Sequence, residues 1–136
     1  MKNEKSCGVI PFFKQDGEWR VIIIKQNNGV VGFPKGHVEN NETEEETALR
    51  EVKEETNLTP TIIKGFREEI SYYIPEYDVN KTVVVFVGLI DDISFTKQIS
   101  EISDIYICSI EEALERINFE DTKKLFKKAI KFINNI

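Results

Sequence analysis

Apolar residues fall into short runs separated by turn residues, a pattern typical of a β-rich fold. Residues 6–13 and 19–25 are two such runs, and Asp16-Gly17 between them is a strong hairpin signal. The successive apolar residues from Val21 to Ile24 predict a strand that is covered on both faces. The same pattern predicts further strands over residues 58–66, 68–74, 81–90 and 104–110.

Helical patterns occupy the stretches between these runs. Residues 42–56 are rich in helix formers, with Asn41 as the expected N-cap, Glu44 completing a capping box and Asn57 as a left-handed C-cap. A capping box at Ser109 predicts a second helix from near residue 111, and residues 122–133 form an amphipathic third. This order predicts an α/β fold, an α/β/α sandwich in which helices cover both faces of a mixed sheet.

Size and composition narrow the function. A chain of 136 residues predicts one domain over residues 1–136, and a net charge of −6 argues against a stable nucleic-acid partner. No apolar run reaches the ~20 residues that span a bilayer, and no signal-peptide pattern opens the chain, so we expect a cytoplasmic protein. His37 is the single histidine and there are two cysteines, so a bound metal would need oxygen ligands, which favours Mg²⁺ or Mn²⁺.

The acidic helix is the first candidate for chemistry. If Val52 faces the core, Glu51, Glu54 and Glu55 fall within an arc of roughly 100° beside it. Their carboxylates repel one another, and a divalent cation would give them one shared partner. A solvated acidic face is the alternative, with about equal weight when the helix is considered alone.

The loop before this helix favours the first interpretation. Gly32 and Gly36 permit tight turns, and Pro34 stiffens the segment between them. Lys35 and His37 place donors beside the carboxylates, where a polyphosphate needs them. Ordinary surface charge and a packed loop histidine are the alternatives for these two residues.

The whole stretch resembles the Nudix box, G-x5-E-x7-R-E-U-x-E-E-x-G-U with U aliphatic. Gly36 and Glu42 match its first two positions, and residues 50–58 match the remainder except that Asn57 replaces the last glycine. Asparagine tolerates the left-handed conformation, so the helix end should be intact. The resemblance implies the α/β/α sandwich and hydrolysis of a nucleoside diphosphate linked to another group, with Mg²⁺ or Mn²⁺.

Carried over by position, the resemblance assigns roles to the box residues. It implies metal ligation by Glu54, Glu55 and the Gly36 carbonyl, with Glu51 as a ligand or base. Arg50, with Glu42, is implied to orient the carboxylates. Which glutamate acts as general base stays open.

The run from Pro34 to Glu39 is similar to the asymmetric diadenosine tetraphosphate hydrolases within that family. Lys81-Thr82-Val83 resembles the Lys-x-Val strand of that subfamily, which implies that Lys81 contacts phosphate. Ser100-Glu101 followed by residues 110–113 resembles its closing segment, which implies that Glu101 is a further metal ligand or base. Tyr73 is our candidate substrate contact, from a group of three tyrosines that could form an aromatic platform. The chain departs from that subfamily where a base would bind, at Val31, Val85, Tyr106 and Ile107.

The expected partner is therefore a small-molecule nucleotide polyphosphate, most simply diadenosine tetraphosphate cleaved to ATP and AMP. Three other substrates fit the same chemistry: 5′-triphosphorylated RNA, nucleoside triphosphates and inositol polyphosphates. A non-catalytic nucleotide-binding module is the alternative of another class. No membrane partner is expected, and the sequence is compatible with a monomer or a homodimer.

Overall fold

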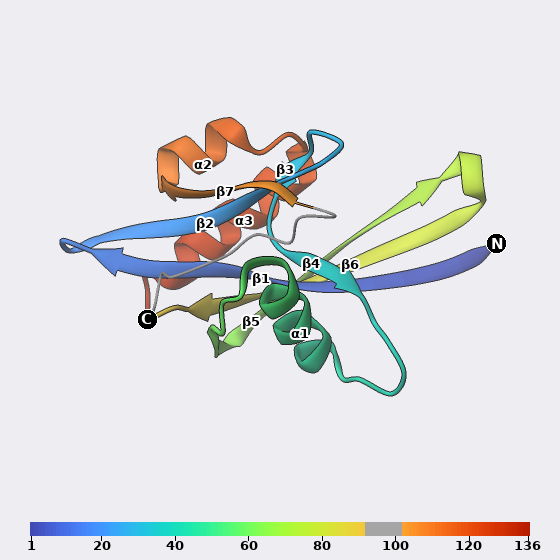
Figure 1. Cartoon of the computed structure of the whole chain (residues 1–136), viewed down its shortest axis with the longest axis horizontal. Helices are drawn as coiled ribbons and strands as arrows, with labels where there is room; N and C mark the ends of the chain where they lie inside the picture. Colours follow the sequence, from blue (N-terminus) through green and yellow to red (C-terminus); the bar gives the residue numbers. More distant parts are fainter. Residues whose placement is uncertain (92–101) are drawn as a thin grey trace.

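In a computed structural model, which describes residues 1–91 and 102–136, the chain is a mixed sheet with helices on both faces (Figure 1). This confirms the predicted fold class. The strands are β1 (Lys2–Gln15), β2 (Glu18–Gln26), β3 (Val31–Gly32), β4 (Lys35–His37), β5 (Thr61–Ile74), β6 (Val79–Leu89) and β7 (Ile102–Ser109). The helices are α1 (Glu44–Thr56), α2 (Ile110–Arg116), α3 (Glu120–Ile133) and the 3₁₀ turn η1 (Pro75–Tyr77).

The main path of the sheet runs β3-β2-β1-β6-β5, with β4 paired to β1 and β7 paired to β2. The pairing of β1 with β6 is parallel, from Lys2 opposite Val79 to Phe12 opposite Leu89, and the other pairings are antiparallel. The predicted Asp16-Gly17 turn joins β1 to β2, and both residues have positive φ as a tight hairpin requires.

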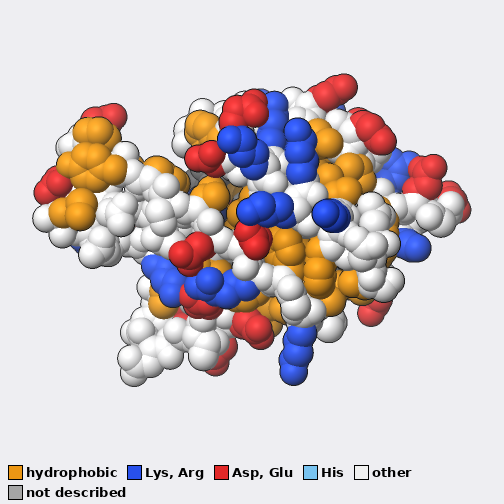
Figure 2. Space-filling view, turned by 180° about the vertical axis from the view of Figure 1, so that it is seen from behind, with side chains coloured by type: hydrophobic (Ala, Val, Ile, Leu, Met, Phe, Trp, Pro, Cys, Tyr) orange, Lys and Arg blue, Asp and Glu red, His pale blue; other side chains and the backbone are white. Residues whose placement is uncertain are grey.

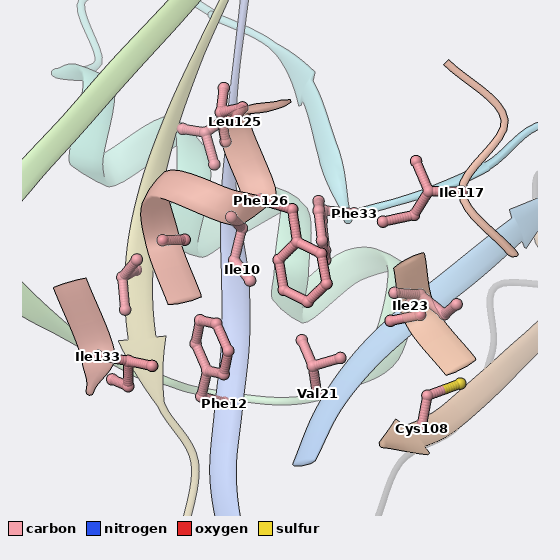
Figure 3. Close-up of a cluster of buried hydrophobic side chains, with 14 of the residues drawn as sticks. Ile10, Phe12, Val21, Ile23, Phe33, Cys108, Ile117, Leu125, Phe126 and Ile133 are labelled. Carbon is pink, nitrogen blue, oxygen red and sulfur yellow. The ribbon is translucent and has the colours of Figure 1, made fainter. Parts of the chain in front are cut away.

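Two hydrophobic clusters cover the two faces of the sheet. Alternate residues of β2 divide between them: Ile22 packs with Ala48 and Val52 of α1, whereas Val21 and Ile23 pack on the α2–α3 side. The prediction that this strand is covered on both faces is confirmed. On the α3 side, the side chains of Phe12, Phe33 and Phe126 form the centre of the core, as Figure 3 shows.

The start of α1 corrects the sequence prediction. The N-cap is Thr43 rather than Asn41: its Oγ1 accepts from the Glu46 N–H at 3.1 Å, and the Glu46 carboxylate accepts from the Thr43 N–H at 2.8 Å. The other end is as predicted, because Asn57 adopts the left-handed conformation with φ 62°. The capping box of Ser109 and Glu112 at α2 is also confirmed.

Two further predictions change at the β5–β6 hairpin. The two strands expected over residues 58–74 form one strand, β5, with an irregularity between Ile62 and Arg67 around Gly65 at φ 108°. The expected loop after it contains η1. The end of this hairpin projects from the body, and exposed hydrophobic side chains, including Tyr73 and Tyr77, gather there (Figures 1 and 2).

Candidate active site

Arg50 is the hub of the polar groups on α1. Its guanidinium donates from Nε to Glu42 at 2.6 Å, and from Nη1 to Glu51 at 2.8 Å and to Glu54 at 3.1 Å. Nη2 donates to the main-chain carbonyl of His37 at 2.9 Å. We call Glu42, Glu51, Glu54 and Glu55 the carboxylate cluster. Arg50 therefore fixes three of its four members and ties α1 to the end of β4.

Glu42 lies before α1 and binds the Arg50 guanidinium through its carboxylate. Its carboxylate also accepts from the Thr47 hydroxyl at 2.9 Å and from the Glu39 N–H at 3.0 Å. Hydrogen bonds from Arg50 lower the pKa of Glu42 to about 2, and hydrogen bonding to Glu42 raises the pKa of Arg50. Both groups are thus charged at neutral pH. The supporting role that the family resemblance implies for Arg50 and Glu42 stays a prediction.

Glu55 joins the cluster to the glycine-containing loop. Its side chain is only 3% exposed, and its Oε1 accepts from the Lys35 main-chain N–H at 2.9 Å. Lys35 belongs to β4, which pairs with β1 at Ser6–Gly8. The sequence predicts that this loop lies beside the carboxylates. In the structure the contact is made by the main-chain N–H of Lys35, which donates to Glu55.

Gly36 is required by the position of Glu51. A Cβ atom added at Gly36 would overlap the Glu51 carboxyl group, so the backbone of β4 and this carboxylate lie in direct contact. Glu51 is largely buried, with 12% of its side chain exposed, whereas Glu54 is 48% exposed. A glycine here therefore lets the Gly36 main chain and the Glu51 carboxylate share one small space.

The donor chemistry of this space fits a hard divalent cation. The close approach at Gly36 brings a carboxylate against main chain, and oxygen atoms of this kind are the ligands that Mg²⁺ prefers. Over residues 1–91 and 102–136, however, no three acidic, histidine or cysteine side chains converge into a ready-made site. Glu51 and Glu54 are turned toward Arg50 instead. Glu101 lies outside the described residues.

A pocket of about 560 Å³ opens on the α3 side of the sheet. Its floor is the sheet itself, at Gly8 of β1 and Ile70, Lys81, Val83 and Val85 of β5 and β6. Two exposed aromatic side chains, Tyr72 at 41% and Phe119 at 57%, belong to its lining. The remaining lining residues come from the segment between the end of β2 and the start of β4 and from the first turns of α3: Gln26, Asn28, residues 30–35, residues 120–122 and Leu125.

Lys35 and Lys81 bring positive charge to this mostly apolar pocket. Burial lowers the pKa of Lys35, and the neighbouring Lys81 lowers it further, against the opposing effect of Glu55 and Glu51. The two ammonium groups therefore lie close enough to repel each other. Two cations held together beside an apolar pocket are well suited to the phosphate oxygens of a nucleotide.

The other predicted substrate contacts lie apart from this pocket. Tyr73 follows Tyr72 on β5, so its side chain points to the opposite face, and its hydroxyl donates to Asp78 at 2.6 Å. The side chain of His37 is exposed, and its main-chain carbonyl is the group that binds Arg50. Neither side chain lines the pocket.

Sequence analysis missed Phe119 as a candidate. It lies in the break between α2 and α3, in the linker formed by residues 117–119. The available sequence signal was only an aromatic residue in the break between two predicted helices, which does not show that its side chain is exposed. Val31 and Val85, two positions where the chain departs from the subfamily, both line the pocket.

In the part of the chain that the structure describes, no helix has both the length and the apolar character needed to cross a bilayer.

The chain is similar to known proteins over nearly its whole length. The asymmetrical bis(5′-nucleosyl)-tetraphosphatase of Sus scrofa is 28% identical over 141 residues, and that of Mus musculus is 29% identical over 147 residues; each alignment covers 95% of both chains. The crystal structure of a C. elegans Ap4A hydrolase binary complex superimposes with a TM-score of 0.89 at 24% identity, covering 98% of this chain and 99% of that one. Residues 2–129 match the NUDIX domain. The chain is a hydrolase that belongs to the Nudix family.

Proposed function

We propose that this protein hydrolyses a phosphoanhydride bond of a dinucleoside polyphosphate, with diadenosine tetraphosphate cleaved to ATP and AMP. The names of the curated relatives support the substrate class, because both are asymmetrical bis(5′-nucleosyl)-tetraphosphatases. The pocket supports it independently, because it joins aromatic and apolar walls to a pair of lysines.

The position of Lys35 is the observation that carries the proposal. Its main-chain N–H binds Glu55 of the carboxylate cluster, and the same residue lines the pocket beside Lys81. A ligand whose base enters the pocket would thus extend its phosphates past Lys35 toward α1. A nucleotide polyphosphate has this arrangement of an apolar base followed by a chain of negative charges.

In this proposal the carboxylate cluster provides the metal site. Glu51, Glu54, Glu55 and the Gly36 carbonyl, together with Glu101, would hold Mg²⁺ or Mn²⁺. When bound, such a cation lowers the pKa of a water molecule and offsets the charge of the polyphosphate. Arg50 orients Glu51 and Glu54, and a glutamate of the cluster accepts a proton from the attacking water.

The pocket positions the substrate for this chemistry. Tyr72 and Phe119 offer aromatic surfaces against which a nucleobase can stack, a contact worth about 1–3 kcal/mol per base. Lys35 and Lys81 bind the non-bridging phosphate oxygens and stabilise the negative charge that develops on them. Among the predicted contacts, we propose Tyr72 in place of Tyr73 for the base, and leave His37 as a candidate donor at the end of β4.

Product analysis of diadenosine tetraphosphate hydrolysis in ¹⁸O-labelled water tests the proposal. We expect ATP and AMP as products, a requirement for Mg²⁺ or Mn²⁺, and label in one of the two products, which identifies the phosphorus attacked. Two molecules of ADP would show that the cleavage is symmetrical. Binding without any product over hours would contradict the proposed turnover.

Initial rates on other substrates decide between the alternatives that share this chemistry. Inositol polyphosphates have no aromatic group for Tyr72 and Phe119, so we expect them to be the poorest substrates. Nucleoside triphosphates and 5′-triphosphorylated RNA present a base and are the closer rivals. A cytoplasmic location, the absence of a stable nucleic-acid partner and a monomeric or dimeric state stay predictions.

A further inference from the structure

We propose that Asn118 is a positioning residue that sets the width of the nucleotide pocket by holding Phe119 at its rim. This inference rests on the proposed function, since it assigns Phe119 to the substrate's base. Asn118 itself does not line the pocket. Its role would therefore be exerted through its neighbours.

Asn118 connects two walls of the pocket that are far apart in the sequence. Its side-chain Oδ1 accepts from the Val31 main-chain N–H at 2.5 Å, across a separation of 87 residues. Its own main-chain N–H donates to the Val31 carbonyl at 3.5 Å. Both polar groups of the Val31 backbone are thus engaged by one residue. Val31 is buried and lines the pocket, so this clasp joins β3 to the linker before α3.

The linker needs such a clasp because α3 begins without a side-chain cap. Phe119 occupies the N-cap position of α3 and makes no capping hydrogen bond, whereas α1 and α2 each begin with a capping box. Ile117, on the other side of Asn118, is only 1% exposed and anchors the linker in the core. Phe119 is 57% exposed, so packing alone does little to fix it. The clasp at Asn118 is the polar restraint beside it.

The loop before Val31, on the other side of the Asn118 hydrogen bonds, is itself held by several hydrogen bonds. The loop after β2 is closed by main-chain bonds, from the Gln26 N–H to the Val30 carbonyl at 2.8 Å and from the Gly29 N–H to the Gln26 carbonyl at 2.9 Å. The Asn28 side chain accepts from the Val30 N–H at 3.0 Å. Asn118 therefore ties the linker beside Phe119 to a hydrogen-bonded loop, and its side-chain amide makes the shorter of the two bonds between these walls.

Removing the amide should weaken binding and leave the chemical step intact, because the carboxylate cluster packs on the other face of the sheet. For N118A we expect KM for diadenosine tetraphosphate to rise about tenfold, equivalent to about 1.4 kcal/mol, with kcat within about twofold of wild type. N118D keeps an acceptor at the same place and should recover most of the affinity. N135A is the control, since the Asn135 side-chain amide also bonds main chain, here by donating to the Lys131 carbonyl at 2.8 Å, but lies just beyond the far end of α3.

A double-mutant cycle with F119A tests whether Asn118 acts through Phe119. In the F119A background, N118A should raise KM by less than about twofold further. Full additivity of the two substitutions would overturn the proposal, as would a fall in kcat with KM unchanged. Thermal unfolding of each variant checks the fold, and if N118A does not fold, N118S carries the same prediction because its shorter side chain cannot reach the Val31 N–H.

A second readout separates this inference from the proposed function. Calorimetric binding of ATP to wild type and N118A, without metal, requires no turnover. Weaker binding by N118A would support the clasp even if diadenosine tetraphosphate is not hydrolysed. Equal binding by the two proteins, together with wild-type hydrolysis, would overturn the clasp and leave the proposed function standing.

Discussion

The carboxylate cluster and the pocket meet at Lys35 but are assembled in different ways. Over residues 1–91 and 102–136, the hydrogen-bond and ion-pair partners of Arg50 lie within 13 residues of it along the chain, so one short segment contains this polar network. The pocket takes residues from Gly8 to Leu125, and its walls are mostly apolar. The polar network around Arg50 thus comes from one stretch of sequence, whereas the shape of the pocket depends on the tertiary fold. We expect damage to the first region to appear in kcat and damage to the second in KM.

The largest effect should come from the carboxylates themselves. E54Q keeps the shape of the side chain and removes its charge, so we expect kcat to fall about 10³-fold with little change in KM. Steady-state kinetics on diadenosine tetraphosphate measures both. E45Q, an exposed acid on the same helix, is the control. A loss in kcat of less than about tenfold for E54Q would contradict its assignment as a metal ligand.

A backbone substitution tests the same region without touching its charges. In G36A the new methyl group would overlap the Glu51 carboxyl group and displace it, and we expect kcat/KM to fall on the order of 100-fold. The protein should still fold, since a flexible side-chain end can move aside. G32A is the control for stability, because a Cβ there meets nothing within 4 Å. Wild-type activity in G36A would show that the contact between Gly36 and Glu51 does not matter.

The aromatic residues of the pocket should show the opposite kinetic signature. For Y72A and F119A we expect KM to rise roughly tenfold to a hundredfold, the loss of one base-stacking contact, with kcat nearly unchanged. Y73A and Y77A are matched controls from the same hairpin that lie outside the pocket lining. A larger effect from Y73A than from Y72A would support the sequence-based choice of Tyr73. It would also contradict the proposal that the nucleobase binds in the pocket beside Tyr72.

The smallest effect concerns stability in acid. Hydrogen bonds from Arg67 lower the pKa of Glu44 from 4.5 to about 2, so the folded state gains stability from this carboxylate above pH 4.5. That gain is lost as the pH falls toward 2. Wild type should exceed E44Q in unfolding free energy by up to about 1 kcal/mol at pH 7.

Denaturant unfolding from pH 7 to pH 2 measures this difference, which should shrink toward zero in acid. E45Q, on the same first turn of α1, is the control variant. A difference between wild type and E44Q that stays constant with pH would contradict the assignment of the Glu44 pKa shift to Arg67.

The two regions also differ in how far sequence could predict them. The left-handed Asn57 follows from local chemistry and was predicted. The N-cap was not, because Asn41 and Thr43 are both capping residues with a glutamate three positions later. Tertiary contacts decide between them: Glu44, the partner expected for Asn41, binds Arg67 of β5 instead.

The choice of tyrosine shows the same limit in the pocket. Tyr72 and Tyr73 are chemically equivalent in sequence, and only the register of β5 against β6, with Tyr72 opposite Lys81, decides which one faces the pocket. Phe119 depends on a clasp across 87 residues, a relation that no local pattern records. Local spacing can thus predict the members of the carboxylate cluster, whereas the residues that line the pocket can be named only from the fold.

The parallel pairing of β1 with β6 has a consequence for how this chain folds. Lys2 pairs with Val79, so one edge of β1 has no partner strand until a segment 77 residues later has been synthesised. At a synthesis rate of about 5–20 residues per second, this wait is on the order of 4–15 s. Meanwhile the β1–β2 hairpin would expose an unpaired apolar edge on the nascent chain, including Val9 and Ile10. We therefore expect refolding to be slow for a chain of this size, and its yield to fall as protein concentration rises.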